Sequence, residues 1–544
     1  MLGGLPERHG GGRLMAPQLL ARSRAEAPAR AGDAAPRRWA TGGWWITAAL
    51  LLSLALTVRG LAGADADWRV ALGRLITAHG LPATEPFSYQ PTPHPWVAQG
   101  WLLDVLLSRL WALGGAGLTM VVMGAAGTAA LLLAALAVRR AERVPGLLVA
   151  GATLVSAIVA APQLGVTGAT ITALGAAVCL LLLTRWREGA TRAIWLLPAV
   201  VLVWANLDPG FVAGLGLVAL GGLTVAVRRR LDPGSEVGAE LRPLSAALVL
   251  ALAATLATPA GVHVWSSLGE NLAGAGLGVT AWQSPGFHTW PMRLLEVEAV
   301  GMVVLWALSG RLDPLDAVLG LAALAVTLGF AGAAPILAVV ALPQLAHSAS
   351  AAITRHGPAV QRALGHGGVV LRRPPPRPRA LPAVALAVAA AAALVAVAPR
   401  LTASRTAADL AASEPVAAAD YVAAHLAGDR LYSSVEWGGY LALRFPTGRL
   451  VGAYGPPAAT GATAQQRALD VHQLKADWQR LLEQDGVTHA VLPQDAREVA
   501  ALEEVGWLPL CHDAAARAVV LAAGPRPAAD APVPDATRAP ACTG

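Results

Sequence analysis

Charged residues are scarce in this 544-residue sequence, at 14%, whereas hydrophobic residues make up 55% of it. A chain of this size with so little charge is too apolar for an ordinary soluble enzyme. A membrane-spanning helix needs about 20 mainly apolar residues, and such windows recur from Trp44 to Pro399. Runs such as 380–399 have no polar face, which argues against a large soluble helical protein. We therefore expect a multi-pass integral membrane protein.

Lysine is almost absent: Lys475 is the only one, so the net charge of +7 rests on arginine. The richness in arginine, alanine, glycine and proline is typical of a GC-rich genome. The arginines occur in short clusters between apolar runs, which argues against nucleic acid as a partner. Such clusters are better explained as topology signals.

The sequence also lacks the usual layout of a signal peptide. Residues 1–43 carry seven arginines ahead of the first apolar run. This pattern predicts a disordered cytoplasmic tail followed by an uncleaved first helix.

The apolar runs predict about 11 transmembrane helices within residues 44–399. They cover about 44–63, 116–138, 145–161, 164–184, 193–207, 211–227, 243–262, 295–310, 316–333, 335–350 and 380–399. With the N-terminus inside, each arginine cluster falls on the cytoplasmic side of the plasma membrane, as the positive-inside rule requires. Residues 64–115 and 263–294 then form long outer loops, and the odd number of spans places the C-terminal region outside.

The region after Arg400 has the charge density of a soluble domain. Residues 400–523 are expected to form a small extracytoplasmic α/β domain. We predict helices near 414–427, 464–484 and 495–504, strand-like turns at 430–445, and strands at 488–493 and 518–523. Residues 524–544, rich in proline, alanine and aspartate, are expected to be disordered.

The sequence has three cysteines. Cys179 lies in a predicted membrane helix and is expected to be a small packing residue. Cys511 and Cys542 are both predicted outside, where a disulfide can form, although Cys542 lies in the tail.

The first outer loop holds two acidic residues, Asp65 and Asp67, at the end of the first span. The amphipathic and tryptophan-rich stretches that follow are typical of segments lying in the membrane interface, where they would contact lipid. A carboxylate near a surface of low dielectric constant has a raised pKa, which favours removal of a proton from a hydroxyl group. The carboxylates can also ligate a metal, or simply solvate a helix end.

Short sequence stretches beyond this pair form a recognisable order. The first outer loop reads Asp-x-Asp-Trp, then Gly-x-Pro-x-x-x-Pro-Phe-Ser-Tyr, then Pro-Trp-Val-x-x-x-Trp-Leu, ending at Leu102. Further stretches lie at 204–211, 258–287 and 436–446. Together they resemble bacterial multi-spanning glycosyltransferases of the GT-C class, which use polyprenyl-phosphate-linked sugars. The resemblance extends over most of the chain in short pieces.

The resemblance implies an inverting transfer of a sugar from a polyprenyl-phosphate donor to a cell-envelope acceptor on the outer face. It implies Asp67, and next Asp65, as catalytic acidic residues. Negative charge on the leaving phosphate requires a cation, for which Arg293 and Arg69 are candidates, with a divalent cation as an alternative. Both arginines can instead extend along the membrane interface. Acceptor or sugar contacts are implied at Trp68, Glu436, Trp437 and Tyr440.

The chain departs from this pattern in three places. Asp208 and Pro209 stand where a histidine and a glycine are expected, Ala281 replaces an acidic residue, and 451–463 replaces a charged segment. A second function therefore stays open: a catalytically inactive relative that binds an envelope glycan or acts as a membrane scaffold. A transporter is disfavoured because no repeated halves with matched broken helices are found. The histidines of the second outer loop lack the spacing of a metal site.

Overall fold

The computed structural model describes residues 43–60, 64–89, 94–139, 144–232, 240–273, 284–288, 290–310, 312–363, 380–426, 430–445, 450–524 and 539–543. The tail predicted over residues 1–43 lies outside these ranges except for its last residue, and so does Ala281.

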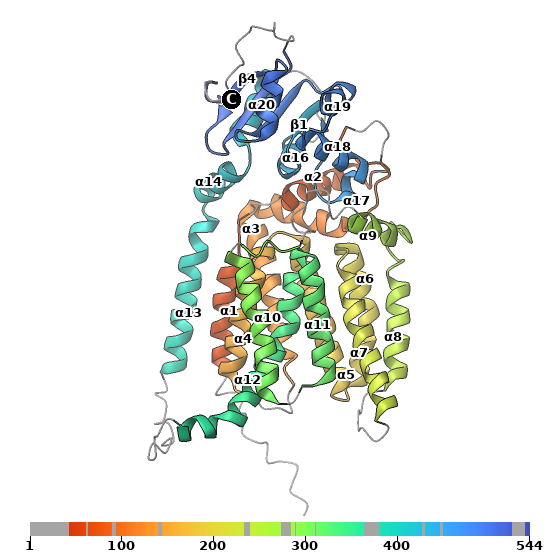
Figure 1. Cartoon of the computed structure of the whole chain (residues 1–544), viewed down its shortest axis with the longest axis vertical. Coiled ribbons are helices and arrows are strands. Elements are labelled where there is room, and N and C mark those ends of the chain that lie inside the picture. The colour runs from red at the N-terminus through yellow and green to blue at the C-terminus, as the bar shows by residue number, and fades with distance from the viewer. Residues whose placement is uncertain are drawn as a thin grey trace, which may run out of the picture. The chain divides into compact units, whose positions relative to one another are not determined.

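The first part of the chain is a helical bundle (Figure 1). Its helices are α1 (Gly43–Thr57), α2 (Ala64–His79), α3 (Trp101–Leu136), α4 (Gly146–Ala160), α5 (Gly168–Arg187), α6 (Leu197–Leu207), α7 (Phe211–Leu231), α8 (Leu241–Ala254), α9 (His263–Ala273), α10 (Trp290–Ser309), α11 (Pro314–Gly329), α12 (Ala334–Ala363) and α13 (Leu381–Val397). Within the described residues, six helices are long and apolar enough to cross a membrane: α3, α4, α5, α7, α12 and α13, some with an adjoining turn. Each of the eleven predicted ranges contains a helix, and the number of spans itself stays a prediction.

Two helices differ from their predicted form. The second predicted span starts at Trp101 rather than near 116, because the tryptophan-rich stretch is itself helical and joins the span at a kink. Gly114 and Gly115 make this kink with non-helical backbone angles, and Gly115 has φ +62°, which favours glycine. Helix α9 occupies a stretch that was predicted as loop.

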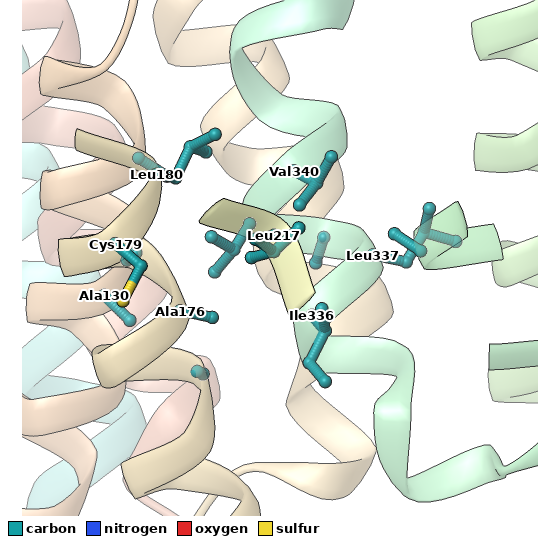
Figure 2. Close-up of a cluster of buried hydrophobic side chains, with 14 of the residues drawn as sticks. Ala130, Ala176, Cys179, Leu180, Leu217, Ile336, Leu337 and Val340 are labelled. Atoms are coloured by element: carbon teal, nitrogen blue, oxygen red, sulfur yellow. The ribbon is translucent and has the colours of Figure 1, made fainter. Parts of the chain in front are cut away.

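The bundle core is packed from small and branched apolar side chains of four helices. Figure 2 shows Ala130, Ala176, Cys179 and Leu217 in this cluster, together with residues of α12. Cys179 is fully buried and reduced, and a Cβ added at Gly214 would lie 2.9 Å from its sulfur. The prediction that Cys179 is a packing residue is therefore confirmed.

An ion-pair network joins three helices at one end of the bundle. Arg139 Nη1 and Arg187 Nη2 lie 2.9 and 2.7 Å from Asp313 Oδ2. The same arginines reach Asp316 at 3.3 and 3.4 Å. The ends of α3 and α5 and the start of α11 therefore lie together, as the sequence predicts, whereas the prediction that this end is cytoplasmic stays a prediction.

The C-terminal region folds as an α/β domain. Its elements are α14 (Ala403–Ser413), α15 (Val416–His425), β1 (Arg430–Ser433), α16 (Val435–Arg444), β2 (Leu450–Val451), α17 (Pro457–Thr460), α18 (Ala462–His472), α19 (Trp478–Gln484), β3 (His489–Pro493), α20 (Arg497–Glu504), β4 (Leu508–Asp513) and β5 (Ala518–Ala522). The five strands form one sheet in the order β2-β1-β3-β5-β4, in which β2, β1 and β3 are parallel and β5 is antiparallel to both neighbours. The α/β class is confirmed, with β2 and β4 as strands the sequence analysis did not predict.

Three predictions in this domain were wrong. The stretch 430–445 forms β1 and helix α16 instead of strand-like turns, because Trp437, Tyr440 and Leu441 bury one helical face. Gly438 lets this helix approach the segment that follows β2, since a Cβ there would lie 2.0 Å from the carbonyl oxygen of Ala453. The single helix predicted at 464–484 is two helices, α18 and α19, separated by a turn.

The C-terminal tail was predicted to be disordered, but its residues 539–543 are ordered against the sheet. Residues 539–543 lie along β4: the amide of His512 donates to Pro540 O at 2.8 Å, and the amide of Cys542 donates to His512 O at 2.8 Å. Cys511 and Cys542 form a disulfide, which the sequence alone left open. The bond attaches this segment to the sheet.

Candidate functional site

Both predicted outer loops meet the C-terminal domain at one end of the bundle (Figure 1). From the first loop, α2 packs against α16 on one side and α3 on the other. From the second loop, α9 packs against α17, and Asn271 Oδ1 accepts a hydrogen bond of 2.9 Å from the amide of Ala458. These contacts place the domain and the first outer loop at the same end of the bundle, as predicted, whereas the side of the membrane on which this end lies stays a prediction.

A strand from the first loop joins the sheet of the C-terminal domain. The amide of Tyr89 donates to Val451 O at 3.0 Å, and the amide of Val451 donates to Phe87 O at 2.9 Å. Residues 87–89 therefore extend the sheet beyond β2 as a parallel edge segment. The Pro-Phe-Ser-Tyr motif thus has a structural role, because it connects the loop to the domain.

Glu85 holds this edge segment in place. Its carboxylate accepts hydrogen bonds from the amides of Phe87 and Ser88, at 2.6 and 2.8 Å, and from the Ser88 hydroxyl. It also accepts a 2.5 Å hydrogen bond from the hydroxyl of Tyr454. Tyr454 belongs to the segment 451–463, one of the departures from the family pattern. The structure shows that this segment supplies contacts to the first outer loop.

Asp67 lies in the first turns of α2 and is only 1% exposed. Asp67 is buried because the adjacent residue, Trp68, packs in one apolar cluster with Trp437 and Tyr440 of α16. Neither carboxylate oxygen of Asp67 has a hydrogen-bond partner within the described part of the chain. Burial raises the pKa of Asp67 to about 7, so the group exchanges a proton near neutral pH.

Glu414 is a second buried carboxyl at this place, and it was not predicted. It lies between α14 and α15, is 3% exposed, and is close enough to feel the charges of Asp67 and Glu436. Burial, followed by those two charges, raises the pKa of Glu414 to about 8. Nothing in the sequence could have indicated it, because 346 residues separate it from Asp67 and its local sequence, Ser-Glu-Pro, is ordinary.

The predicted acceptor contacts lie on α2 and α16. Trp437 is buried, and its indole nitrogen donates to Ser413 O at 3.0 Å. Tyr440 is also buried, and burial and the charge of Asp420 raise its pKa to about 12. Glu436 is exposed at the start of α16. Trp68, which follows Asp67 in the chain, therefore shares one apolar cluster with Trp437 and Tyr440, and Tyr440 is close enough to feel the charge of Asp67.

Arg69, two residues after Asp67 on α2, is buried and points towards α3 of the bundle. Its Nη1 donates to Asp104 Oδ1 of α3 at 2.8 Å, and its guanidinium carbon lies 4.6 Å from the centre of the Trp68 ring. A Cβ added at Gly168 would lie 2.1 Å from Asp208 Oδ1 and 3.5 Å from Arg69 Nη2. The departure at Asp208 therefore puts a second acidic side chain near Arg69.

For the remaining predicted site residues, the described part of the structure shows no contact with Asp67. Arg293 is exposed in the first turn of α10, which packs against α4 and α12. Asp65 belongs to α2, but its side chain lies outside the described part of the structure. No three His, Cys, Asp or Glu side chains in the described ranges are placed to hold a metal ion. A small cavity of about 20 Å³, enough for one water, lies at the Arg139–Asp316 network instead of at Asp67.

Neither a protein-family model nor a curated protein sequence matches the chain. Its structure is similar to solved structures of GT-C glycosyltransferases. One is ArnT from Cupriavidus metallidurans in the apo state, at 18% identity and a TM-score of 0.47, covering 90% of this chain and 100% of that one. Another is the oligosaccharyltransferase AglB from Archaeoglobus fulgidus, solved with an inhibitory peptide and a dolichol-phosphate, at 13% identity and a TM-score of 0.48, covering 86% and 73%. A third is the arabinofuranosyltransferase AftD from Mycobacteria, at 16% identity and a TM-score of 0.43, covering 90% of this chain and 40% of that one.

Proposed function

We propose that this chain is a membrane-embedded glycosyltransferase of the GT-C type. It would move a sugar from a polyprenyl-phosphate donor to a cell-envelope acceptor on the outer face. The observation that carries the proposal is the Asp67 carboxyl, which is buried, lacks a hydrogen-bond partner among the described residues, and has a pKa raised to about 7. An uncompensated buried carboxyl costs stability, and such groups are found where a function needs them.

In the proposed reaction Asp67 acts as the general base. It takes the proton of an acceptor hydroxyl while the hydroxyl oxygen bonds to the anomeric carbon of the sugar. The bond from that carbon to the phosphate oxygen breaks, and polyprenyl phosphate leaves with the bonding electrons. A base with a pKa near the working pH suits this step. Arg69, Arg293 or a divalent cation would offset the charge of the leaving phosphate.

One observation favours the second function, an inactive relative that binds a glycan or scaffolds a partner. Asp67 is covered by the packing of α2 against α16, so a substrate reaches it only if these helices separate. Under that alternative the carboxyl would be a buried remnant and the outer surface of the domain would bind the glycan.

The two functions are separated in a deletion strain whose envelope glycan composition is measured. We expect deletion to change the glycans and the wild-type gene to restore them. Asp67→Asn should fail to restore them although the protein reaches the membrane in normal amount. Asp409→Asn, at an exposed carboxylate of α14, is the matched control and should restore them. Full restoration by Asp67→Asn would eliminate the proposed catalytic role and favour the binding function.

A further inference from the structure

The segment that carries Glu414 is fixed against the helix pair α2–α16. The indole nitrogen of Trp437 donates to the carbonyl oxygen of Ser413, directly before Glu414. Leu410 and Val416, on either side of Glu414, pack on the apolar cluster that contains Trp68. The side chain of Glu414 is therefore held at the α2–α16 contact, next to the turn of α2 that bears Asp67.

The two carboxyl groups lie in a place with little compensation for charge. Glu414 Oε2, like both oxygens of Asp67, is buried without a hydrogen-bond partner in the described ranges. Other ionisable groups that face the pair are Glu436 and Tyr440 on α16. Arg69, on the same helix as Asp67, already has its guanidinium on Asp104 of α3. Two charged carboxylates in such a place repel each other, so one of them keeps its proton.

We propose that Glu414 is a positioning residue of the Asp67 site, whose carboxyl stays protonated while Asp67 is charged. The C-terminal domain would in this way set the protonation state of the carboxylate on α2. The inference deepens the proposed function and rests on it for the role of Asp67 as a base, whereas the pairing of the two carboxyls rests on the packing alone.

The coupling between the two groups supports this assignment. Burial raises the pKa of Asp67 to about 7, and burial together with the charge of Asp67 raises that of Glu414 to about 8. A charged Asp67 therefore keeps the proton on Glu414. Above this range both groups are charged, and their repulsion acts directly on the α2–α16 contact. The contact that covers Asp67 should then loosen.

The test is hydrogen exchange of the full-length protein in lipid nanodiscs, measured at pH 6 and pH 9. Protection factors of α2 and α16 are compared, because they correct for the faster chemical exchange at high pH. At pH 9 we expect wild-type protection to be at least about tenfold lower than that of Glu414→Gln, because a carboxyl with a raised pKa weakens the closed contact progressively from its ordinary pKa in the open state up to about 8. At pH 6 the difference should be smaller, because only the lower part of this range has been crossed. Asp409→Asn, at a carboxylate of α14 that pairs with Arg405, is the matched control and should follow the wild type.

Asp67→Asn provides a reciprocal test, since removal of either charge relieves the repulsion. It should keep its protection at pH 9, and it replaces Glu414→Gln if that variant does not fold. Equal loss of protection in the wild type and in the neutral variants would overturn the inference, and so would wild-type protection that is the same at both pH values. Neither measurement needs a donor or an acceptor. Failure of the proposed enzyme activity would therefore be seen separately, in the glycan analysis.

Discussion

Asp67 costs the protein stability when it is charged. Its carboxylate is 1% exposed and has no hydrogen-bond partner among the described residues, so burial removes its hydration without replacement. Its place in the first turns of α2 offers only the modest stabilisation that a helix N-terminus gives to a negative charge. Residues that break a local rule in this way are expected at functional sites.

This cost makes the stability dependent on pH. The pKa of Asp67 is raised by burial from 3.8 to about 7, so the folded state binds a proton that the unfolded state has released. Below about pH 4 the unfolding free energy is not reduced by Asp67, because the carboxyl is protonated in both states. As the pH rises from there through about 7, this free energy falls, because only the unfolded state has released the proton. At most about 4 kcal/mol of unfolding free energy is involved. We expect the apparent Tm in nanodiscs to fall between pH 4 and pH 8, and to fall less in Asp67→Asn.

Asp409→Asn is the control, because that carboxylate is exposed and paired with Arg405. It should reproduce the wild-type pH profile within the error of the measurement. A wild-type profile that Asp67→Asn leaves unchanged would contradict the prediction.

The contacts of Arg69 change what can be expected of its positive charge. From the sequence it was a candidate cation for a phosphate, whereas in the structure it pairs with Asp104 at 2.8 Å and has Asp208 close by. A buried pair of this kind leaves less positive charge for a ligand than an isolated arginine does. Its role towards a donor therefore stays a prediction.

Among the elements, the edge segment 87–89 is held against the sheet by the carboxylate of Glu85. Glu85 accepts hydrogen bonds from two amides, one serine hydroxyl and Tyr454, and Glu85→Ala leaves these buried donors without an acceptor. We expect a loss of about 3–5 kcal/mol, because hydrogen bonds to a charged group contribute about 1.5–3 kcal/mol each and are not additive. Tyr454→Phe removes one of them and should cost about 1.5–3 kcal/mol.

Urea unfolding measures this loss, and amide exchange at Tyr89 and Val451 shows whether the segment has left the sheet. Glu504→Ala, at an exposed carboxylate of α20, is the control and should change stability by less than about 0.5 kcal/mol. Unchanged exchange at Tyr89 in Glu85→Ala would mean that the carboxylate does not hold the segment.

The disulfide Cys511–Cys542 is expected to stabilise the C-terminal domain. It closes a loop with a sequence separation of 31 residues, for which constraint of the unfolded chain gives about 3–4 kcal/mol. Cys542→Ser should lower the urea midpoint of the C-terminal domain and release residues 539–543 to proteolysis. Cys179→Ala, at the reduced cysteine of the bundle, should leave that midpoint unchanged. The same midpoint in Cys542→Ser would contradict the prediction.

The sequence predicted those elements that have a local signal and missed those made by distant contacts. Apolar runs and alternation were enough for the eleven predicted spans of the bundle, although not for α9, and for β3 and β5. The strand pairing of 87–89 with β2 was not predictable, because its partner lies more than 350 residues away. In the candidate site, residues of α2 and α16 were found through their motifs, although α16 was not predicted as a helix, whereas Glu414 has no local signal and enters through packing alone.

At the scale of the whole molecule, two sets of contacts define the ends of the bundle. At one end the first outer loop, α9 and the C-terminal domain meet (Figure 1). At the other end Arg139 and Arg187 pair with Asp313 and Asp316. Helix α3 joins them: it starts beside α2, where Asp104 pairs with Arg69, and it ends next to Arg139. Its 21 residues after the kink cover about 30 Å, the thickness of the hydrocarbon core.

Because the two ends of the bundle are identified by their contacts, the orientation of the protein in the membrane can be predicted without knowing the number of spans. Arginines cluster at the ion-pair end, so the positive-inside rule predicts that this end is cytoplasmic and that the C-terminal domain is outside. Alkaline phosphatase, which is active only outside the cytoplasm, should be active when fused after residue 524 and inactive when fused after Arg230 at the end of α7. A cytoplasmic reporter at the same positions should give the opposite result. Activity of the phosphatase after Arg230 but not after residue 524 would reverse the orientation. It would also place Asp67 on the wrong side for an acceptor on the outer face, and so separate the proposed chemistry from the envelope.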